Sequence, residues 1–213
     1  MRQLTVYDIG NGELKVNALN SAKERCARCK RCTFWNNGKY VWGCGSLDAD
    51  LMIIGEAPGF HESKTGVPFV GKAGKLLDKI LNAAGFDRRD IYITNVVKHR
   101  PPHNRTPTAT ELKACREFID TEIDVVKPKL IVVTGLTSAK YMLPNVKRIS
   151  EVRGKVMKSG DGTVVIPTLH PAALLRGTEE EIRYKKRITW KDWKLITAVF
   201  DTLKDRRGVI KNG

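Results

Sequence analysis

Four short apolar runs, separated by segments with helical spacing, constrain the fold of this chain more than any other feature. The runs are LMIIG at 51–55, IYITNVV at 91–97, KLIVVTG at 129–135 and VVIPTLHP at 164–171. Runs that are apolar at nearly every position are typical of strands buried on both faces. Their alternation with helices predicts a parallel sheet covered on both sides. We therefore expect an α/β fold, a three-layer α/β/α sandwich around a central four-stranded parallel sheet.

The intervening segments predict helices at 72–86, at 108–126, at SAKYML and at 179–204. A chain of 213 residues is long enough for one globular domain with its own core. Residues 1–20 are polar and weakly patterned, so we expect an N-terminal extension or a first strand there. Residues 21–213 are then expected to form a single domain, which opens with the basic helical segment SAKERCARCKRC.

The charge of the chain favours a polyanionic partner. Lys and Arg number 38 against 23 Asp and Glu, a formal net charge of +15. Such a surface favours nucleic acid over the alternatives of an acidic membrane or an inert basic surface. No run approaches the ~20 apolar residues that span a bilayer. The opening MRQLTVYDIGNG has no signal-peptide or transit character. We therefore expect a soluble, cytoplasmic protein without a membrane partner.

The segment after the first predicted strand reads GEAPGFHESKTGVPFVGKAG. Ligands of parallel α/β sheets bind at the carboxyl ends of the strands, which is where this segment begins. Its glycines leave little side-chain bulk and expose backbone N–H groups, as a ligand-cradling loop requires. It lacks the GxxxxGK[ST] pattern of a phosphate-binding P-loop. The alternative is a turn that is merely rich in glycine.

The second predicted strand ends near Asn95 and is followed by VVKHRPPHNRTP. Lys98, Arg100 and Arg105 lie in this proline-stiffened loop, and a rigid basic loop suits a phosphate backbone. We therefore expect these three residues to bind DNA. Asn95 taken alone is also compatible with a helix cap or a turn.

The fourth predicted strand leads into HPAALLR. His170 at the strand terminus is a candidate catalytic residue, although a single histidine is also compatible with simple packing. Leu174 and Leu175 are expected at the tip of the loop, beside Arg176. An exposed apolar wedge flanked by charge can enter a base stack, so we expect all three to contact DNA.

These three segments, in this order, resemble the uracil-DNA glycosylase superfamily and in particular its family 4, the iron–sulfur type. The resemblance runs from about Cys26 to the last helix. It implies an α/β/α fold and a base-excision-repair enzyme that hydrolyses the N-glycosidic bond of deoxyuridine in DNA and leaves an abasic site. The target nucleotide of such an enzyme must be flipped out of the duplex. The implied partner is uracil-containing DNA, single- or double-stranded, and the expected state is a monomer.

Carried over to this sequence, the family pattern implies roles for individual residues. Phe69 stacks on the flipped uracil, and the amide of Asn95 pairs with its O4 and N3 edge. His170 donates a hydrogen bond toward O2, where negative charge gathers as the bond breaks. Gly55, Glu56 and Ala57 complete the uracil site.

The residue that would activate water matches the family pattern less directly than these residues do. The loop lacks the aspartate that another branch of the superfamily uses to position water, and Glu62 matches an acidic position within the family loop. We expect Glu62 to position water or act as a general base, with a solvated loop carboxylate as the alternative. The acidic run of the family is replaced around it by Phe60, His61 and Ser63.

Five cysteines, three of them in CARCKRC, indicate a metal or cluster site rather than a disulfide framework. The resemblance implies a [4Fe–4S] cluster with a structural role. Its implied ligands are Cys29, Cys32, His99 and Cys115, with His99 at a position where the family has cysteine. Cys44 or Cys26 is the competing fourth ligand, and zinc also fits such a set.

Two other functions remain open from the sequence. A related branch becomes covalently joined to uracil-containing DNA through a loop histidine, and His103 falls close to that position. A noncatalytic, cluster-bearing DNA-binding module is the other alternative. The range of bases accepted beyond uracil also stays open.

Overall fold

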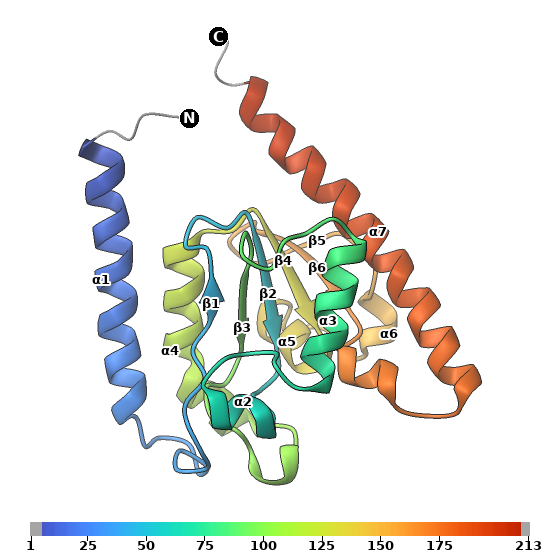
Figure 1. The fold of residues 1–213 in the computed structure, drawn as a ribbon, viewed down its shortest axis with the longest axis horizontal. Helices are drawn as coiled ribbons and strands as arrows, with labels where there is room; N and C mark the ends of the chain where they lie inside the picture. The colour runs from blue at the N-terminus through green and yellow to red at the C-terminus, as the bar shows by residue number, and fades with distance from the viewer. Residues whose placement is uncertain (1–5, 210–213) are drawn as a thin grey trace.

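The computed structural model describes residues 6–209, which form a six-stranded sheet with helices on both faces (Figure 1). Its four central strands lie in the order β3 (Tyr92–Asn95), β2 (Leu51–Gly55), β4 (Leu130–Thr134) and β6 (Val164–Thr168). These four are parallel to one another. These four strands coincide with the four apolar runs of the sequence. Each strand is buried along nearly its whole length, so nearly every position in it is apolar.

Two edge strands make the sheet mixed rather than parallel. β1 (Cys44–Gly45) pairs antiparallel with β3, and β5 (Met157–Lys158) pairs antiparallel with β6. The expected parallel arrangement is confirmed for the four central strands, but the sheet as a whole has six strands and is mixed. Strands of two residues are too short to leave a periodic pattern in the sequence.

Alternate residues of the central strands enter two separate cores, one on each face of the sheet. On one face α3 (Lys72–Ala83) and α7 (Glu179–Val209) cover the strands. On the other face lie α4 (Ala109–Val126) and α5 (Leu136–Met142). The first core contains Leu51, Ile53, Val132, Leu77, Leu81 and Trp193, and the second contains Met52, Ile54, Val133, Ile119 and Met142.

The N-terminal segment is a helix that adds to the α4 side. α1 (Val6–Arg28) runs beside α4 (Figure 1), and Leu19 and Ala22 pack there with Phe118 of α4. The alternative of a first strand in residues 1–20 was wrong for residues 6–20, and the expected domain boundary at 20 falls inside this helix. Residues 1–5 lie outside the described part of the chain.

The remaining elements are short and lie in the connections between the larger elements. They are the helices α2 (Phe60–Thr65) and α6 (Ile149–Val152) and the 3₁₀ turns η1 (Pro102–Asn104) and η2 (Pro171–Leu175). α4 begins at a capping box, in which Thr108 and Glu111 bond each other's backbone N–H groups. Within residues 6–209, no helix is long and apolar enough to cross a bilayer.

Candidate active site

The sheet register brings the predicted site residues to one edge. Gly55 at the end of β2 lies opposite Asn95 at the end of β3, and Thr134 of β4 lies opposite Thr168 of β6. His170 follows two residues after Thr168. Since the four central strands are parallel, all of their carboxyl ends meet at this edge.

Asn95, Phe69 and Gly55 are in close contact at the centre of the edge. A Cβ added at Gly55 would lie 2.3 Å from Asn95 Oδ1 and 2.6 Å from Phe69 Cζ. Only a glycine leaves the space between the amide and the ring open. Asn95 is 2% exposed, and its Oδ1 is a buried acceptor without a hydrogen-bond partner in the structure. A buried unpaired acceptor is costly, and a ligand that donates to it removes that cost.

Phe69 is held in an uncommon backbone conformation, with φ of 53°. A Cβ at Gly74, in the first turn of α3, would lie 1.9 Å from the Phe69 carbonyl oxygen, so the helix can approach only at a glycine. Arg88 donates to the carbonyls of Pro68 and Phe69 at 2.6 and 3.2 Å and pairs with Asp78 at 2.6 Å. These contacts fix the direction in which the ring points.

His170 is positioned by both its ring and its backbone. Its imidazole stacks on Phe69, with 5.6 Å between ring centroids and 28° between planes. Nδ1 accepts a hydrogen bond of 3.1 Å from the Ala172 backbone N–H, which leaves the proton of the neutral ring on Nε2. Burial, with a further contribution from Arg176, lowers the pKa of His170 to about 4. At neutral pH the side chain is therefore an uncharged hydrogen-bond donor through Nε2.

Two carboxylates of the segment after β2, Glu62 and Glu56, both accept hydrogen bonds within the protein. Glu62 is buried and accepts from the backbone N–H groups of Gly59, Val70 and Gly71 at 3.1, 2.9 and 2.7 Å. Its charge raises the pKa of His170, although burial outweighs that effect. Glu56 is half-buried, and Thr137 donates to its Oε2 at 2.5 Å. Glu62 thus shapes the loop that carries Phe69, a role the sequence pattern did not predict.

Three residues of the 55–57 segment were expected around the base. Gly55 lies against Asn95 and Phe69, as described above. The backbone carbonyls of Gly55 and Glu56 accept from Val96 and Val97, which continues the pairing of β2 with β3 beyond the strands. Ala57 is half-buried and packs at the edge of the core between α1 and α4.

The basic loop after β3 does not present all of its cations to solvent. Lys98 is completely buried, and its ammonium bonds Glu122 of α4 at 2.5 Å. The prediction that Lys98 contacts DNA was therefore wrong, because a partner 24 residues away draws it into the protein. Arg100 is partly exposed and lies 5.2 Å from the centre of the Phe60 ring. Arg105 is 40% exposed and bonds Glu111 through both terminal nitrogens at 2.7 and 2.8 Å.

The segment after β6 is a 3₁₀ turn that divides its two leucines. Leu174 is 1% exposed, so the prediction that it forms part of an exposed wedge was wrong. The turn packs against α3 and α7, and this packing covers Leu174. Leu175 is 44% exposed and Arg176 is exposed, so these two keep the geometry expected of a DNA-contacting tip.

The predicted cluster ligands gather between α1 and α4. Cys32 and Cys115 are buried there together with Cys26, and Cys29 lies at the margin of the same group. His99 Nδ1 lies 3.9 Å from Cys32 Sγ. Thiolates and imidazole are the donors that iron–sulfur clusters use, so the donor chemistry fits. Within residues 6–209, no three His, Cys, Asp or Glu side chains converge as a ready site for a single metal ion.

Cys44 stands apart from these thiols. It lies in β1, and its charged neighbours are Arg88 and Glu122 rather than another cysteine. Cys26, in contrast, interacts electrostatically with Cys29 and Cys115. Of the two competing fourth ligands, the structure places Cys26 with the predicted set and Cys44 outside it.

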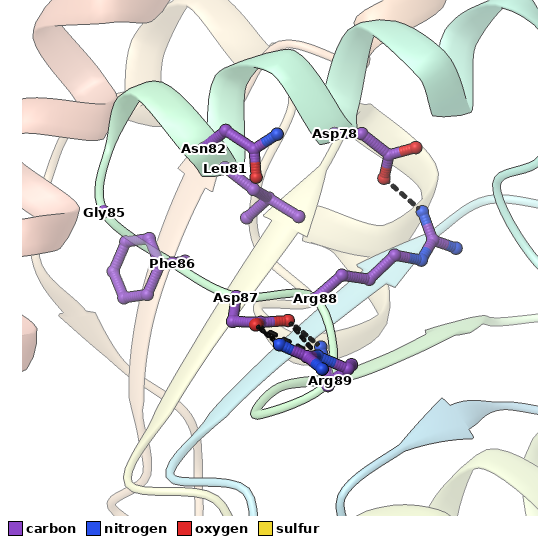
Figure 2. A pocket seen from close by; sticks show the side chains of 8 residues that line it. All are labelled: Asp78, Leu81, Asn82, Gly85, Phe86, Asp87, Arg88 and Arg89. Carbon is purple, nitrogen blue, oxygen red and sulfur yellow. Dashed lines mark hydrogen bonds and ion pairs between the residues drawn. The ribbon is translucent and has the colours of Figure 1, made fainter.

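An open hollow of about 550 Å³ lies at the other end of the strands, where their amino ends meet. Figure 2 shows its lining, which comes from α3 and the loop that leads into β3. Its charged side chains are paired with one another, Arg88 with Asp78 and Arg89 with Asp87, each at 2.6 Å. The hollow lies at the amino ends of the strands, away from Asn95 and His170.

Sequence reasoning missed two residues that support the site, Glu122 and Arg88. Glu122 lies on the same face of α4 as Ile119 and Val126, three residues after one and four before the other. A carboxylate on the apolar face of a helix requires a buried partner, and this signal was available in the sequence. Arg88 sits in a loop and left no comparable pattern.

Comparisons with known proteins show the family to which the chain is similar. A model of the uracil DNA glycosylase superfamily matches residues 42–194. A type-4 uracil-DNA glycosylase of Thermotoga maritima is 44% identical over 162 residues, which cover 75% of this chain and 84% of that protein. The type-4 enzyme of Sulfurisphaera tokodaii is 43% identical over 169 residues, covering 75% and 77%. That of Saccharolobus solfataricus is 39% identical over 166 residues, covering 74% and 77%.

Proposed function

The chain belongs to the uracil-DNA glycosylase superfamily, in its type-4 branch, and we propose that it excises uracil from DNA with Asn95, Phe69 and His170 as the residues that hold and release the base. The family predicted from the sequence motifs is thereby confirmed. The single observation that supports these residue roles is the buried Asn95 Oδ1, which has no partner and adjoins the Phe69 ring.

The amide of Asn95 distinguishes uracil from cytosine. Uracil offers N3–H to Oδ1 and O4 to the amide N–H, so both bonds form together. Cytosine has an unprotonated N3 and an exocyclic amine, so acceptor would face acceptor and donor would face donor. The mismatch would leave buried groups unpaired, which is strongly selective. Phe69 supplies the stacking surface, and Gly55 leaves room for the ring of the base.

His170 stabilises the departing base. As the C1′–N1 bond breaks, negative charge gathers on uracil O2, and the Nε2–H of neutral His170 donates to it. The sugar becomes oxocarbenium-like and is attacked by water, which at such a centre needs orientation more than a strong base. We assign the orientation of water to Glu62, whose Oε2 accepts only one backbone bond and which lies close enough to influence His170.

The DNA surface follows from the residues that stay exposed around this edge. Arg100, Arg105 and Arg176 are the proposed phosphate contacts, and Leu175 is the proposed wedge that fills the gap left by the flipped base. The proposed substrate is uracil-containing DNA, single- or double-stranded, and the proposed state is a monomer. Covalent capture through His103 is not favoured, since the relatives are named as glycosylases.

The thiol group between α1 and α4 is the proposed site of a [4Fe–4S] cluster, held by Cys29, Cys32 and Cys115 with His99 or Cys26 as the fourth ligand. Such a cluster would supply structural cross-linking, because glycosidic hydrolysis involves no change of oxidation state. Cys29 and Cys32 follow α1, and Cys115 lies in α4. A cluster held by these cysteines would therefore join the end of the N-terminal helix to the helix that follows the basic loop. Zinc is the second candidate for the same donors.

The proposal is tested by release of uracil from an oligonucleotide without added divalent metal. Asn95→Ala should lower the rate of release by about 10² to 10³ and leave a residual rate that single-turnover assays can measure, whereas Asn82→Ala, at an exposed asparagine of α3, should leave the rate unchanged. Equal activity of wild type and Asn95→Ala would overturn the assignment. Parallel substrates with thymine, hypoxanthine and xanthine define the base range.

The cluster is tested separately from activity. Protein purified in air should absorb near about 400 nm and contain iron, and Cys115→Ser should lose both signals. Cys44→Ser is the matched control, because Cys44 lies outside the thiol group. Stoichiometric zinc in a colourless protein would replace iron in this proposal.

A further inference from the structure

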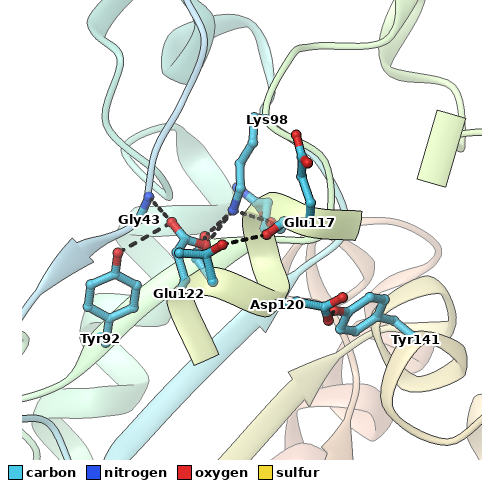
Figure 3. Close-up of polar contacts among 10 residues, drawn as sticks. Gly43, Tyr92, Lys98, Glu117, Asp120, Glu122 and Tyr141 are labelled. Carbon is cyan, nitrogen blue, oxygen red and sulfur yellow. Dashed lines mark hydrogen bonds and ion pairs between the residues drawn. The ribbon is translucent and has the colours of Figure 1, made fainter. Parts of the chain in front are cut away.

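The buried ion pair of Lys98 and Glu122 has no place in the chemistry described so far. Both side chains are 0% exposed, and Lys98 Nζ lies 2.5 Å from Glu122 Oε2. Burying two charges is expensive, and well-packed apolar residues would serve stability as well. Figure 3 shows the Lys98 ammonium against the Glu122 carboxylate, which Gly43 and Tyr92 also reach. The other contacts of Lys98 indicate what the pair does.

Lys98 uses all three of its N–H donors within the protein. One reaches Glu122, the second reaches Thr94 Oγ1 at 2.8 Å, and the third reaches the backbone carbonyl of Asn95 at 2.9 Å. Thr94 and Asn95 are the last two residues of β3, so the Lys98 ammonium restrains the end of this strand through both hydrogen bonds. The Asn95 carbonyl belongs to the same residue whose side-chain oxygen is unpaired.

Glu122 is in turn anchored by several elements. Its Oε1 accepts from the Gly43 backbone N–H at 2.8 Å and from the Tyr92 hydroxyl at 3.3 Å. Its Oε2 also accepts from Thr94 Oγ1 at 2.7 Å. The carboxylate therefore ties α4 to β3 and to the segment before β1, and Lys98 passes that restraint to Asn95.

We propose that Lys98 and Glu122 are positioning residues that hold the backbone of Asn95 so that its amide meets the Watson–Crick edge of the flipped base. This rests on the proposed role of Asn95 in binding uracil. Both side chains are completely buried, and the bond from Lys98 to the Asn95 carbonyl is their link to the proposed base site, so the pair acts through Asn95. A displacement of a binding group by about 1 Å can cost about a hundredfold in rate, which makes a rigid restraint valuable.

A comparable ion pair at the end of β6, the strand that precedes His170, provides a matched control. Arg153 pairs with Asp192 at 2.5 Å, and Asp192 accepts from Thr168 Oγ1 at 2.8 Å at the end of β6. This pair also braces a strand end, but its contacts lie on β6 and α7 and do not include Asn95. Its removal should affect the enzyme independently of Asn95.

The test is a double variant, Lys98→Met with Glu122→Gln, which removes both charges and leaves no single charge buried. We expect its thermal transition to lie well above that of Lys98→Met alone, its single-turnover excision rate to fall about tenfold to a hundredfold, and inhibition by free uracil to weaken. In an Asn95→Ala background the same double change should cause no further loss. The control pair, Arg153→Met with Asp192→Asn, should cause the same loss in both backgrounds.

Three outcomes would overturn the positioning role. In the first, the double variant folds and keeps the wild-type rate and the wild-type inhibition by uracil. In the second, the double change lowers the rate by the same factor with and without Asn95. In the third, the rate of the double variant falls while its inhibition by uracil is unchanged. A wild-type protein that releases no uracil, or an Asn95→Ala variant with full activity, would instead refute the proposed function itself.

Discussion

The two edges of the sheet differ in a way that separates a site from a hollow. The amino edge has an open space of about 550 Å³, but its Arg and Asp side chains are already paired. At the carboxyl edge the Phe69 and His170 rings are stacked together, yet Asn95 Oδ1 beside them is buried and unpaired. Open volume therefore does not identify the site here. We propose instead that the base binds where the buried, unpaired Asn95 amide oxygen lies.

The largest expected effect lies at the carboxyl edge. His170→Ala should lower kcat by about 10² to 10³, because a preorganised donor to the developing anion is lost. His103→Ala should keep close to the wild-type rate and release as much uracil as the wild-type enzyme. A rate for His170→Ala within a few-fold of wild type would contradict its assignment and weaken the contrast between the edges.

The pH dependence sharpens the same assignment. The pKa of His170 is lowered to about 4, mainly by burial and further by Arg176. Because the neutral ring is the active form, kcat/KM should stay level from neutral pH down to about pH 5 and fall as pH drops through about 4. Arg176→Gln removes a nearby positive charge, so it should move that acid limb to higher pH. An acid limb at the ordinary histidine value, unmoved by Arg176→Gln, would contradict this.

Arg88 connects the two edges. It lines the hollow and also holds the carbonyls of Pro68 and Phe69. Arg88→Met should raise KM by about tenfold, since a lost hydrogen bond to a charged donor is worth about 1.5–3 kcal/mol and frees the Phe69 loop. Asn82→Ala, on the same rim, should leave KM unchanged. Equal effects of the two variants would mean that the hollow itself takes part in function.

The smallest effect on catalysis is expected in η2, the 3₁₀ turn that follows His170. Leu175→Ala should lower the excision rate on duplex DNA by a small factor and leave the rate on single strands and the melting temperature unchanged. Leu174→Ala should cost about 2–5 kcal/mol of folding free energy, because Leu174 is buried. Thermal unfolding and paired duplex and single-strand assays distinguish the two. A reversed pattern would mean that Leu174, not Leu175, meets the DNA.

The parts of the site that sequence reasoning predicted are those with local patterns. The four central strands were visible as apolar runs, and the motifs after them identified Asn95, Phe69 and His170, which the structure brings together at one edge. The neutral tautomer of His170 was not visible, because it depends on the Ala172 N–H and on burial. Nor was the engagement of Glu62 by three backbone groups, which requires the folded loop.

Lys98 and Arg100 show where local reasoning ends. They stand two positions apart in one basic loop, yet Lys98 is buried against Glu122 while Arg100 reaches the surface. Leu174 and Leu175 divide in the same way within one 3₁₀ turn. Periodicity determined the α/β order, and the resemblance of three motifs determined the family and the residues proposed to meet the base, because these depend on neighbours along the chain. The direction of each charged or apolar side chain was decided only when α3, α4 and α7 packed on the sheet, because burial depends on partners that are distant in sequence.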